Sequence, residues 1–166
     1  MPNPHPFVVH FPIALFIGAV ICELLAYFFK SKLLSEAGLV ASITSVAAAL
    51  TAVITGLLAA SIVPEKGLVR EVLESHETLG YLVLAASTCF AALKLYSYVK
   101  NSDRYLVSQI ALGLIGAIIT ILAAHEGGEL VYQHGVGVDA SQKNVAKYPI
   151  VINRADSLLD SSKAKK

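Results

Sequence analysis

The chain has few charged residues and no basic stripe that could follow a phosphate backbone. Asp, Glu, Lys and Arg make up 15% of its 166 residues, and the formal net charge is only +1. The basic residues are scattered except for three near the C-terminus, Lys163, Lys165 and Lys166. A nucleic-acid-binding surface needs Lys and Arg clustered on one face. The sequence therefore argues against a nucleic-acid partner.

The chain is also poor in reactive motifs. Its two cysteines, Cys22 and Cys89, lie inside apolar runs without Cys-x-x-Cys spacing, which indicates packing residues more than a disulfide or a metal pair. No Cys-x-x-Cys-His motif for covalent haem is present, and no Ser or Cys stands in a recognisable nucleophile motif. Hydrolytic catalysis is therefore disfavoured, and the sequence fits an electron-transfer subunit better than a stand-alone enzyme.

Long apolar runs dominate what is present. Hydrophobic residues make up 55% of the chain, and its mean hydropathy of +0.66 is well above that of soluble domains. A helix needs roughly 20 apolar residues to cross a bilayer, and lipid requires each span to satisfy its own backbone hydrogen bonds. Four stretches meet this requirement, approximately 7–29, 37–63, 76–99 and 105–125. The first residues carry no recognisable signal peptide, so we expect the first span to remain in the mature protein.

Short connections between the spans predict an up-down bundle. The segments 30–36, 64–75 and 100–104 are short, so neighbouring spans should be antiparallel. The apolar residues within 64–75 fall on one side of a helical wheel, which predicts a short helix on the membrane surface with Ser75 as N-cap of the third span. The predicted fold class is an all-α integral membrane four-helix bundle over 1–138. The polar remainder, 139–166, is either a flexible tail or a segment that docks on the outer face or on a partner.

Basic residues near the span ends predict the orientation of the chain. Cytoplasmic loops are usually rich in Lys and Arg. Four such residues flank one side of the bundle and two lie in the opposite connection, namely Lys30, Lys32, Lys100 and Arg104 against Lys66 and Arg70. The first side should face the cytoplasm, and both termini should face outward.

All five histidines gather at one end of the predicted bundle. His10 lies three residues into the first span, His76 opens the third and His125 closes the fourth, so antiparallel spans place them at similar depth. His5 precedes the first span, and His134 follows a helix-breaking pair of glycines, so both can fold over the same region. Histidines at membrane depth are costly unless they pair with something. We therefore expect a shared site at the outer ends of spans one, three and four.

These histidines could hold a haem or a metal ion, because imidazole is the commonest protein ligand of both. The leading hypothesis is a noncovalent haem b, with His5 in a supporting position. Its axial ligands would come from four histidines: His10, His76, His125 and His134. A non-haem copper, zinc or iron site between the same side chains is the second hypothesis. Histidines that merely sit at the interface, in a ligand-free structural subunit of a membrane complex, are the third. Acidic neighbours could orient the imidazoles or ligate a hard cation themselves: Glu77, Glu126 and Glu129.

Glycines inside the spans could make room for a haem. Gly80, one turn after His76, offers room for a porphyrin to approach the backbone. Gly113 and Gly116, deeper in span four, serve either a cofactor or plain helix packing.

A second feature lies near the predicted cytoplasmic side. Glu23 of span one and Lys94 of span three have matching depths. A buried ion pair is the natural interpretation, with Thr44 and Ser45 as hydrogen-bond donors to it. A proton or ion relay through the bundle is the alternative.

Two stretches carry a family resemblance: His5-Pro6 with Val9–Leu15 at the start, and Gly127–Tyr132 with His134–Val138 at the end. Together they resemble the ends of the domain-of-unknown-function family numbered 2231, and the similarity covers the whole bundle. That family comprises small prokaryotic four-helix membrane proteins without an agreed activity, some of them joined to Rieske-type iron–sulfur domains. The resemblance implies a protein of the prokaryotic inner membrane. It agrees with electron exchange between an outer-face haem and a periplasmic or membrane redox partner.

Overall fold

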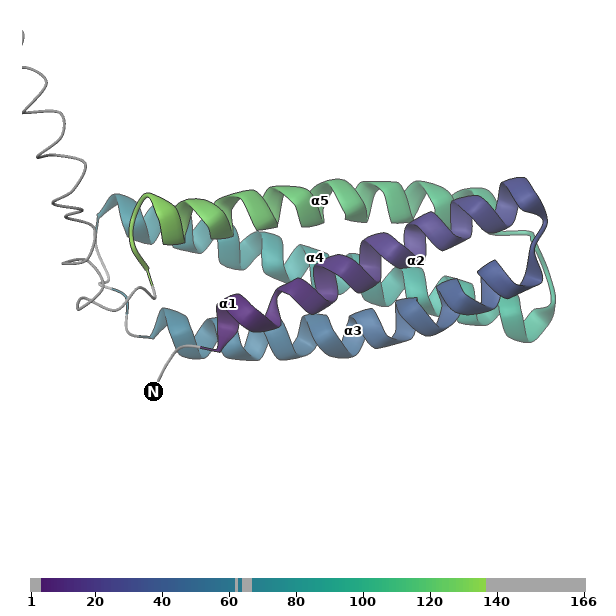
Figure 1. Cartoon of the computed structure of the whole chain (residues 1–166), viewed down its shortest axis with the longest axis horizontal. Helices are drawn as coiled ribbons and strands as arrows, with labels where there is room; N and C mark the ends of the chain where they lie inside the picture. The colour runs from purple at the N-terminus through teal and green to yellow at the C-terminus, as the bar shows by residue number, and fades with distance from the viewer. Residues whose placement is uncertain (1–3, 62, 64–66, 137–166) are drawn as a thin grey trace, which may run out of the picture. The chain divides into compact units, whose positions relative to one another are not determined.

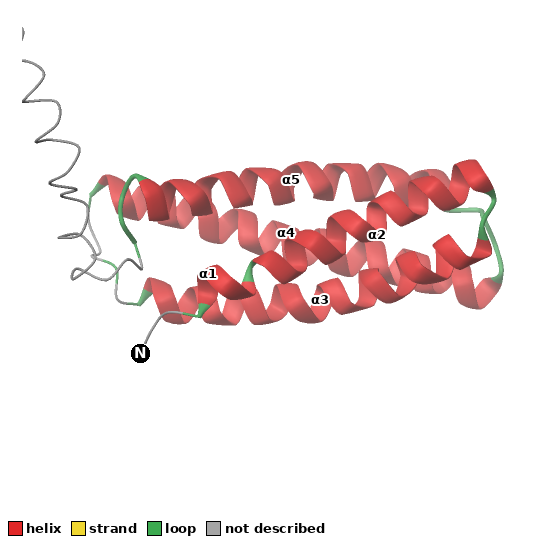
Figure 2. Cartoon of the chain, viewed as in Figure 1, coloured by secondary structure: helices red, strands yellow, loops and turns green. Residues whose placement is uncertain are grey.

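Long apolar segments with few helix breakers fold into four long helices, preceded by one short helix (Figure 1). The structure is a computed structural model that describes residues 4–61, 63 and 67–136; the predicted tail, 139–166, lies outside them. The helices are α1 His5–Val8, α2 His10–Phe29, α3 Lys32–Ala60, α4 Leu68–Lys100 and α5 Leu106–Tyr132. Figure 2 shows only helices and turns in the described part of the chain. The predicted all-α four-helix bundle is confirmed.

The turns at one end of the bundle are set by backbone conformation and by a serine cap. We call this the turn end, defined by Lys30 and Asn101, which both adopt a left-handed conformation with φ of 52° and 47°. Ser31 Oγ accepts a hydrogen bond from the Leu34 N–H at 3.4 Å. Because this cap satisfies a free backbone donor, α3 begins at Lys32, five residues before the predicted start of the span.

The third span and the segment before it form one helix. α4 runs unbroken from Leu68 to Lys100, so the predicted separate surface helix is wrong, and Ser75 lies inside the helix where an N-cap was predicted. No Gly or Pro interrupts 68–75, and the helix starts after Gly67, whose φ of 103° suits glycine. The Ser75 hydroxyl instead donates to Glu126 Oε1 on α5 at 2.9 Å.

α5 also extends further than the sequence predicted. It continues through Gly127 and Gly128 to Tyr132, so the glycine pair does not break the helix and His125 does not end it. Glycine costs a helix about 1 kcal/mol relative to alanine. A Cβ added to Gly127 would lie only 3.0 Å from Cε1 of the His76 ring, so the glycine makes room for a packed side chain. Packing between helices here outweighs the local preference of the residues.

Two phenylalanines fill the middle of the bundle. Phe16 of α2 and Phe90 of α4 are fully buried and meet edge to face, with ring centroids 5.7 Å apart and an interplanar angle of 87°. Added Cβ atoms at Gly113 and Gly116 of α5 would approach these rings to 2.9 Å and 2.7 Å. Both glycines therefore serve helix packing against the two rings.

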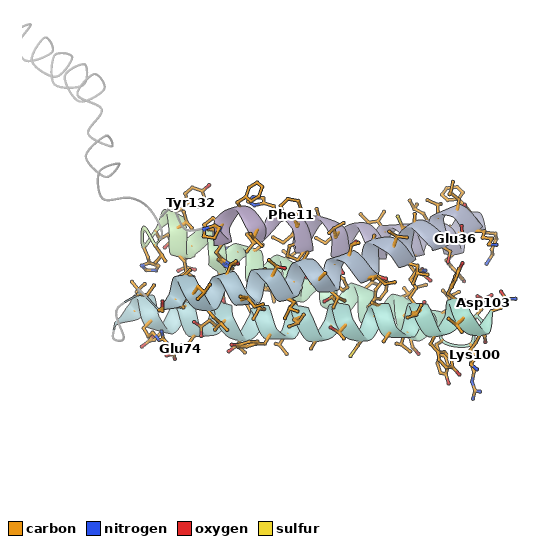
Figure 3. The ribbon with its side chains drawn as sticks, turned by 90° about the horizontal axis from the view of Figure 1, so that it is seen from below. Phe11, Glu36, Glu74, Lys100, Asp103 and Tyr132 are labelled. Atoms are coloured by element: carbon orange, nitrogen blue, oxygen red, sulfur yellow. The ribbon has the colours of Figure 1, made fainter. Side chains whose placement is uncertain are left out.

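The outward surface of the bundle is apolar along the length of its helices. Large side chains such as Ile54, Leu58, Ile115 and Ile118 are more than half exposed. Figure 3 shows Glu74 and Tyr132 at one end of the bundle and Glu36 and Asp103 at the other. Each long helix has the length and hydropathy to cross a membrane. The chain is thus a multi-pass membrane protein whose sides contact the lipid bilayer.

Candidate ligand-binding site

A cavity of about 400 Å³ lies inside the end of the bundle opposite the turn end. We call this the histidine end, and the space the histidine cavity. All five helices contribute to its wall, which consists mainly of small and aliphatic side chains. Its polar lining residues are few, namely His5, His10, His76, Glu77, Tyr81, Thr120 and Tyr132. Small-molecule sites have volumes of about 300–1,000 Å³ and this same mixture of apolar wall and few polar groups.

Buried apolar side chains form part of the cavity wall. Ala60, Leu73 and Leu130 are buried together where α3 ends, α4 begins and α5 ends, and they line the cavity. Thr120, 1% exposed, lies one turn from Gly116 and donates to its carbonyl oxygen at 2.8 Å. The hydroxyl is thus satisfied within its own helix, so Thr120 presents mainly an apolar methyl group to the cavity.

His5 and His76 meet in this cavity. Their ring centroids are 6.2 Å apart, and the ring planes make an angle of 77°. His5 comes from α1 and His76 from the first third of α4, so two segments 71 residues apart bring one imidazole each to the same place. Sequence reasoning selected His76 as a ligand but gave His5 only a supporting position.

The hydrogen bonds of the two rings favour Nδ1 as the nitrogen that carries the proton. His76 Nδ1 lies 3.0 Å from the carbonyl oxygen of Ala123, which can only accept, so Nδ1 is the donor. His5 Nδ1 lies 3.2 Å from Thr55 Oγ1, and the His5 ring also hydrogen-bonds to the Ala52 backbone. The Thr55 hydroxyl lies 2.9 Å and 3.1 Å from the carbonyl oxygens of Thr51 and Ala52 and donates to its own helix, so its oxygen is placed to accept from His5 Nδ1. In a neutral imidazole with Nδ1 protonated, Nε2 is the nitrogen that can bind a metal.

Glycines make room for both rings. A Cβ added to Gly56 of α3 would lie 2.9 Å from Cε1 of His5, just as one at Gly127 would lie 3.0 Å from Cε1 of His76. Gly80 also lines the cavity, and an added Cβ there would meet nothing within 4 Å. The room that the sequence assigned to Gly80 is therefore present.

The other three histidines do not join this pair. His10 borders the cavity but is exposed, and its Nδ1 donates to the Phe7 carbonyl oxygen at 3.3 Å. His125 is exposed and does not line the cavity. His134 lies beside Glu129, with 3.9 Å between Nε2 and Oε1, and its Nε2 is buried without a hydrogen-bond partner among the described residues. The sequence predicted one shared site for all five histidines. In the structure only His5 and His76 meet in the cavity.

The acidic residues at the histidine end take up different positions. Glu77 lines the cavity, whereas Glu126 lies behind the wall and accepts the Ser75 hydroxyl proton. Glu129 faces His134. Across residues 4–61, 63 and 67–136, no three His, Cys, Asp or Glu side chains come close enough to hold a metal ion together.

Comparison with known families agrees with this architecture. A family model described as a predicted membrane protein, DUF2231, matches residues 2–140. The chain belongs to the DUF2231 family. Searches of curated proteins and of solved structures find no match. The family resemblance predicted from the two ends of the bundle is thus confirmed, and the match covers the whole bundle.

At its turn end this DUF2231 protein holds a second polar cluster. Lys94 Nζ donates to Glu23 Oε2, and the two residues are 3% and 4% exposed. Lys94 also donates to Ser35 Oγ at 3.3 Å. A cavity of about 500 Å³ with a mostly polar lining adjoins the pair. The matched depths of Glu23 and Lys94 in the sequence correspond to this contact.

The hydroxyls around the ion pair differ from those predicted. Thr44 and Ser45 bond to backbone carbonyl oxygens of their own helix, as is usual for Thr and Ser in membrane helices. Ser35 lies outside the predicted span, and only the earlier start of α3 brings it to Lys94. No pattern in the sequence therefore pointed to Ser35.

Proposed function

We propose that this DUF2231 protein binds one haem b between His5 and His76 and acts in electron transfer. The observation that carries the proposal is the meeting of two imidazoles in an apolar cavity, with 6.2 Å between the ring centroids. Metal–imidazole bonds are about 2 Å long, so two imidazoles that share one ion have centroids about 6 Å apart. The angle of 77° between the rings is also compatible, because each imidazole can turn about its metal–nitrogen bond.

The number of convergent ligands favours haem over the non-haem alternative. A structural zinc site takes four protein ligands and a catalytic one takes three. A haem with two axial histidines needs only two, because the porphyrin supplies the remaining four nitrogens. In the described part of the chain no third His, Cys, Asp or Glu lies close enough to share a metal ion with His5 and His76, so the two imidazoles suit haem better.

The surroundings of the two rings support the same ligand. Metal-binding histidines usually donate their second ring nitrogen to a neighbouring acceptor, as His5 does to Thr55 and His76 does to Ala123. The small side chains of the cavity wall, including Gly80, allow a flat macrocycle to approach the helices. Apolar walls would keep water from the iron.

The proposed role is that of an electron carrier or subunit. When bound, haem b would supply reversible one-electron transfer between its ferric and ferrous states. His5 and His76 would hold the iron at the histidine end of the bundle, within the apolar wall of the cavity. We place the chain in a prokaryotic inner membrane with this face outward, next to a periplasmic or membrane redox partner or a larger complex.

An absorption spectrum tests the proposal directly. Full-length protein purified in mild detergent is titrated with ferric haem, and spectra are recorded before and after reduction with dithionite. The proposal predicts saturation at one haem per chain and a reduced spectrum with a sharp α-band and a shifted Soret band. Protein that takes up no haem would contradict it. Stoichiometric copper, zinc or iron in elemental analysis, without haem bands, would favour the non-haem site instead.

A further inference from the structure

Glu126 of α5 has one buried carboxylate oxygen. Its Oε1 accepts from Ser75 Oγ at 2.9 Å, whereas Oε2 is buried and has no hydrogen-bond partner in the part of the chain that the structure describes. Glu126 also forms no ion pair with any described residue. Glu126 as a whole is half-buried, so the cost falls on this one oxygen: a buried carboxylate oxygen is destabilising unless a positive charge or a further donor compensates it.

The position of Glu126 relates this charge to the histidine cavity. The residue lies one helical turn after Ala123, whose carbonyl oxygen accepts from His76. Its partner Ser75 directly precedes His76 on α4. Glu126 is therefore fixed beside the His76 side of the cavity but is not part of its wall, so it acts on an occupant through its field and not through contact.

We infer that Glu126 is a built-in counter-charge for a cationic occupant of the histidine cavity, and that it favours the ferric over the ferrous state of a haem bound there. The inference rests on the proposed function and further specifies that the bound ligand is positively charged. The core of a ferric porphyrin with two neutral imidazoles carries one positive charge, which is lost on reduction. Glu77, which lines the cavity, has the same sign and adds to the effect. A neutral occupant would leave the Glu126 charge uncompensated.

The test is a redox titration of the haem-loaded, full-length protein and of its Glu126→Gln variant. Gln keeps the shape of the side chain and can still accept from Ser75, so only the charge is removed. A unit charge within roughly 10 Å at an effective dielectric constant of about 20 changes such a preference by about tenfold. The preference for ferric over ferrous haem should therefore be about tenfold weaker in the variant than in wild type. This corresponds to a midpoint potential that is higher by about 59 mV for a one-electron couple.

Two controls separate charge from structure. Glu126→Asp keeps the charge and should keep a potential near that of wild type. Glu74→Gln removes a carboxylate that is exposed and paired with Arg70 on the same side of the bundle, and it should leave the potential unchanged. A second readout needs no haem: haem-free Glu126→Gln should melt at a higher temperature than haem-free wild type, because an uncompensated charge is gone.

The outcomes distinguish this inference from the proposed function. A potential that is the same in wild type and Glu126→Gln, both loaded with haem, would overturn the role of Glu126 alone. A haem-free variant that melts no higher than wild type would also count against it. Wild-type protein that binds no haem would overturn the proposed function itself.

Discussion

Each of the two facing imidazoles rests against a glycine of a neighbouring helix. His5 packs on Gly56 and His76 packs on Gly127, where an added Cβ would lie 2.9 Å and 3.0 Å from the respective ring. Gly18 of α2 has nothing within 4 Å of an added Cβ and does not line the histidine cavity. Gly127 and Gly18 therefore form a matched pair of helical glycines in which only one supports an imidazole.

We predict that Gly127→Ala and Gly18→Ala differ in haem binding. Both changes favour the helix by about 1 kcal/mol. Only the methyl group added by Gly127→Ala pushes the His76 ring out of position, and loss of the groups that orient a metal ligand typically costs about 10–100-fold in affinity. Haem titration should therefore show a weakened Gly127→Ala variant and a Gly18→Ala variant like wild type. Equal affinities for the two variants would mean that the His76 ring position does not matter to the ligand.

The sequence predicted the depth of the histidines but not the direction in which they point. Span ends place His76 and His125 at similar depth, and this is all that hydropathy can provide. Ala123 and Gly127 of α5 both line the cavity, and His125 lies midway between them. At 100° per residue it faces away from both, which explains its exposure. Direction depends on how the helices pack, and this information is distributed over the whole bundle.

At the scale of helices, a buried ion pair joins α2 to α4. Glu23 and Lys94 are almost completely buried at the turn end, whereas Lys32 and Glu36 form a mostly exposed pair at 3.6 Å near the start of α3. Removing one partner of a buried pair leaves an uncompensated charge, whereas exposed pairs contribute little.

We predict that Lys94→Met destabilises the protein by about 3–5 kcal/mol, because Glu23 is left buried and unpaired. The double variant Glu23→Met, Lys94→Met should recover most of this loss, because no charge remains to be buried. Lys32→Met is the control and should stay within about 1 kcal/mol of wild type. Unfolding of the purified variants in detergent measures all three. Wild-type stability for Lys94→Met alone would show that Glu23 does not depend on its partner.

Helix existence was predictable from the sequence, whereas helix boundaries were not. The four apolar runs are long enough that lipid leaves helix as the only choice. The ends of the helices depend on polar residues, which a hydropathy pattern assigns to the loops. Ser31 caps α3 early, and the segment 68–75 simply continues α4 because nothing breaks it. α5 passes through two glycines because His76 packs against one of them.

The whole molecule has two chemically different ends. The histidine end holds an apolar cavity with two imidazoles, and the turn end holds a polar cavity beside a buried ion pair. Phe16 and Phe90 lie between them and close the middle of the bundle. The two cavities are thus suited to different roles, and the orientation of the chain decides which one faces the cell exterior.

We predict that the histidine end faces outward. Lys30, Lys32, Lys100 and Arg104 flank the turn end, and basic residues of short loops remain in the cytoplasm. Alkaline phosphatase, which is active only outside the cytoplasm, should be active when fused after Lys166 and inactive when inserted at Ser31. The opposite pattern would reverse the orientation and place the redox partner in the cytoplasm.

The most direct test of the central claim compares the ferric haem spectra of wild type, His5→Ala, His76→Ala and His125→Ala. Two imidazole ligands give six-coordinate low-spin iron, so wild type and His125→Ala should show low-spin spectra of equal intensity. His5→Ala and His76→Ala should each become high-spin or lose the haem. A low-spin spectrum that survives in both of these variants, or that disappears in His125→Ala, would contradict the assignment of His5 and His76 as the axial pair.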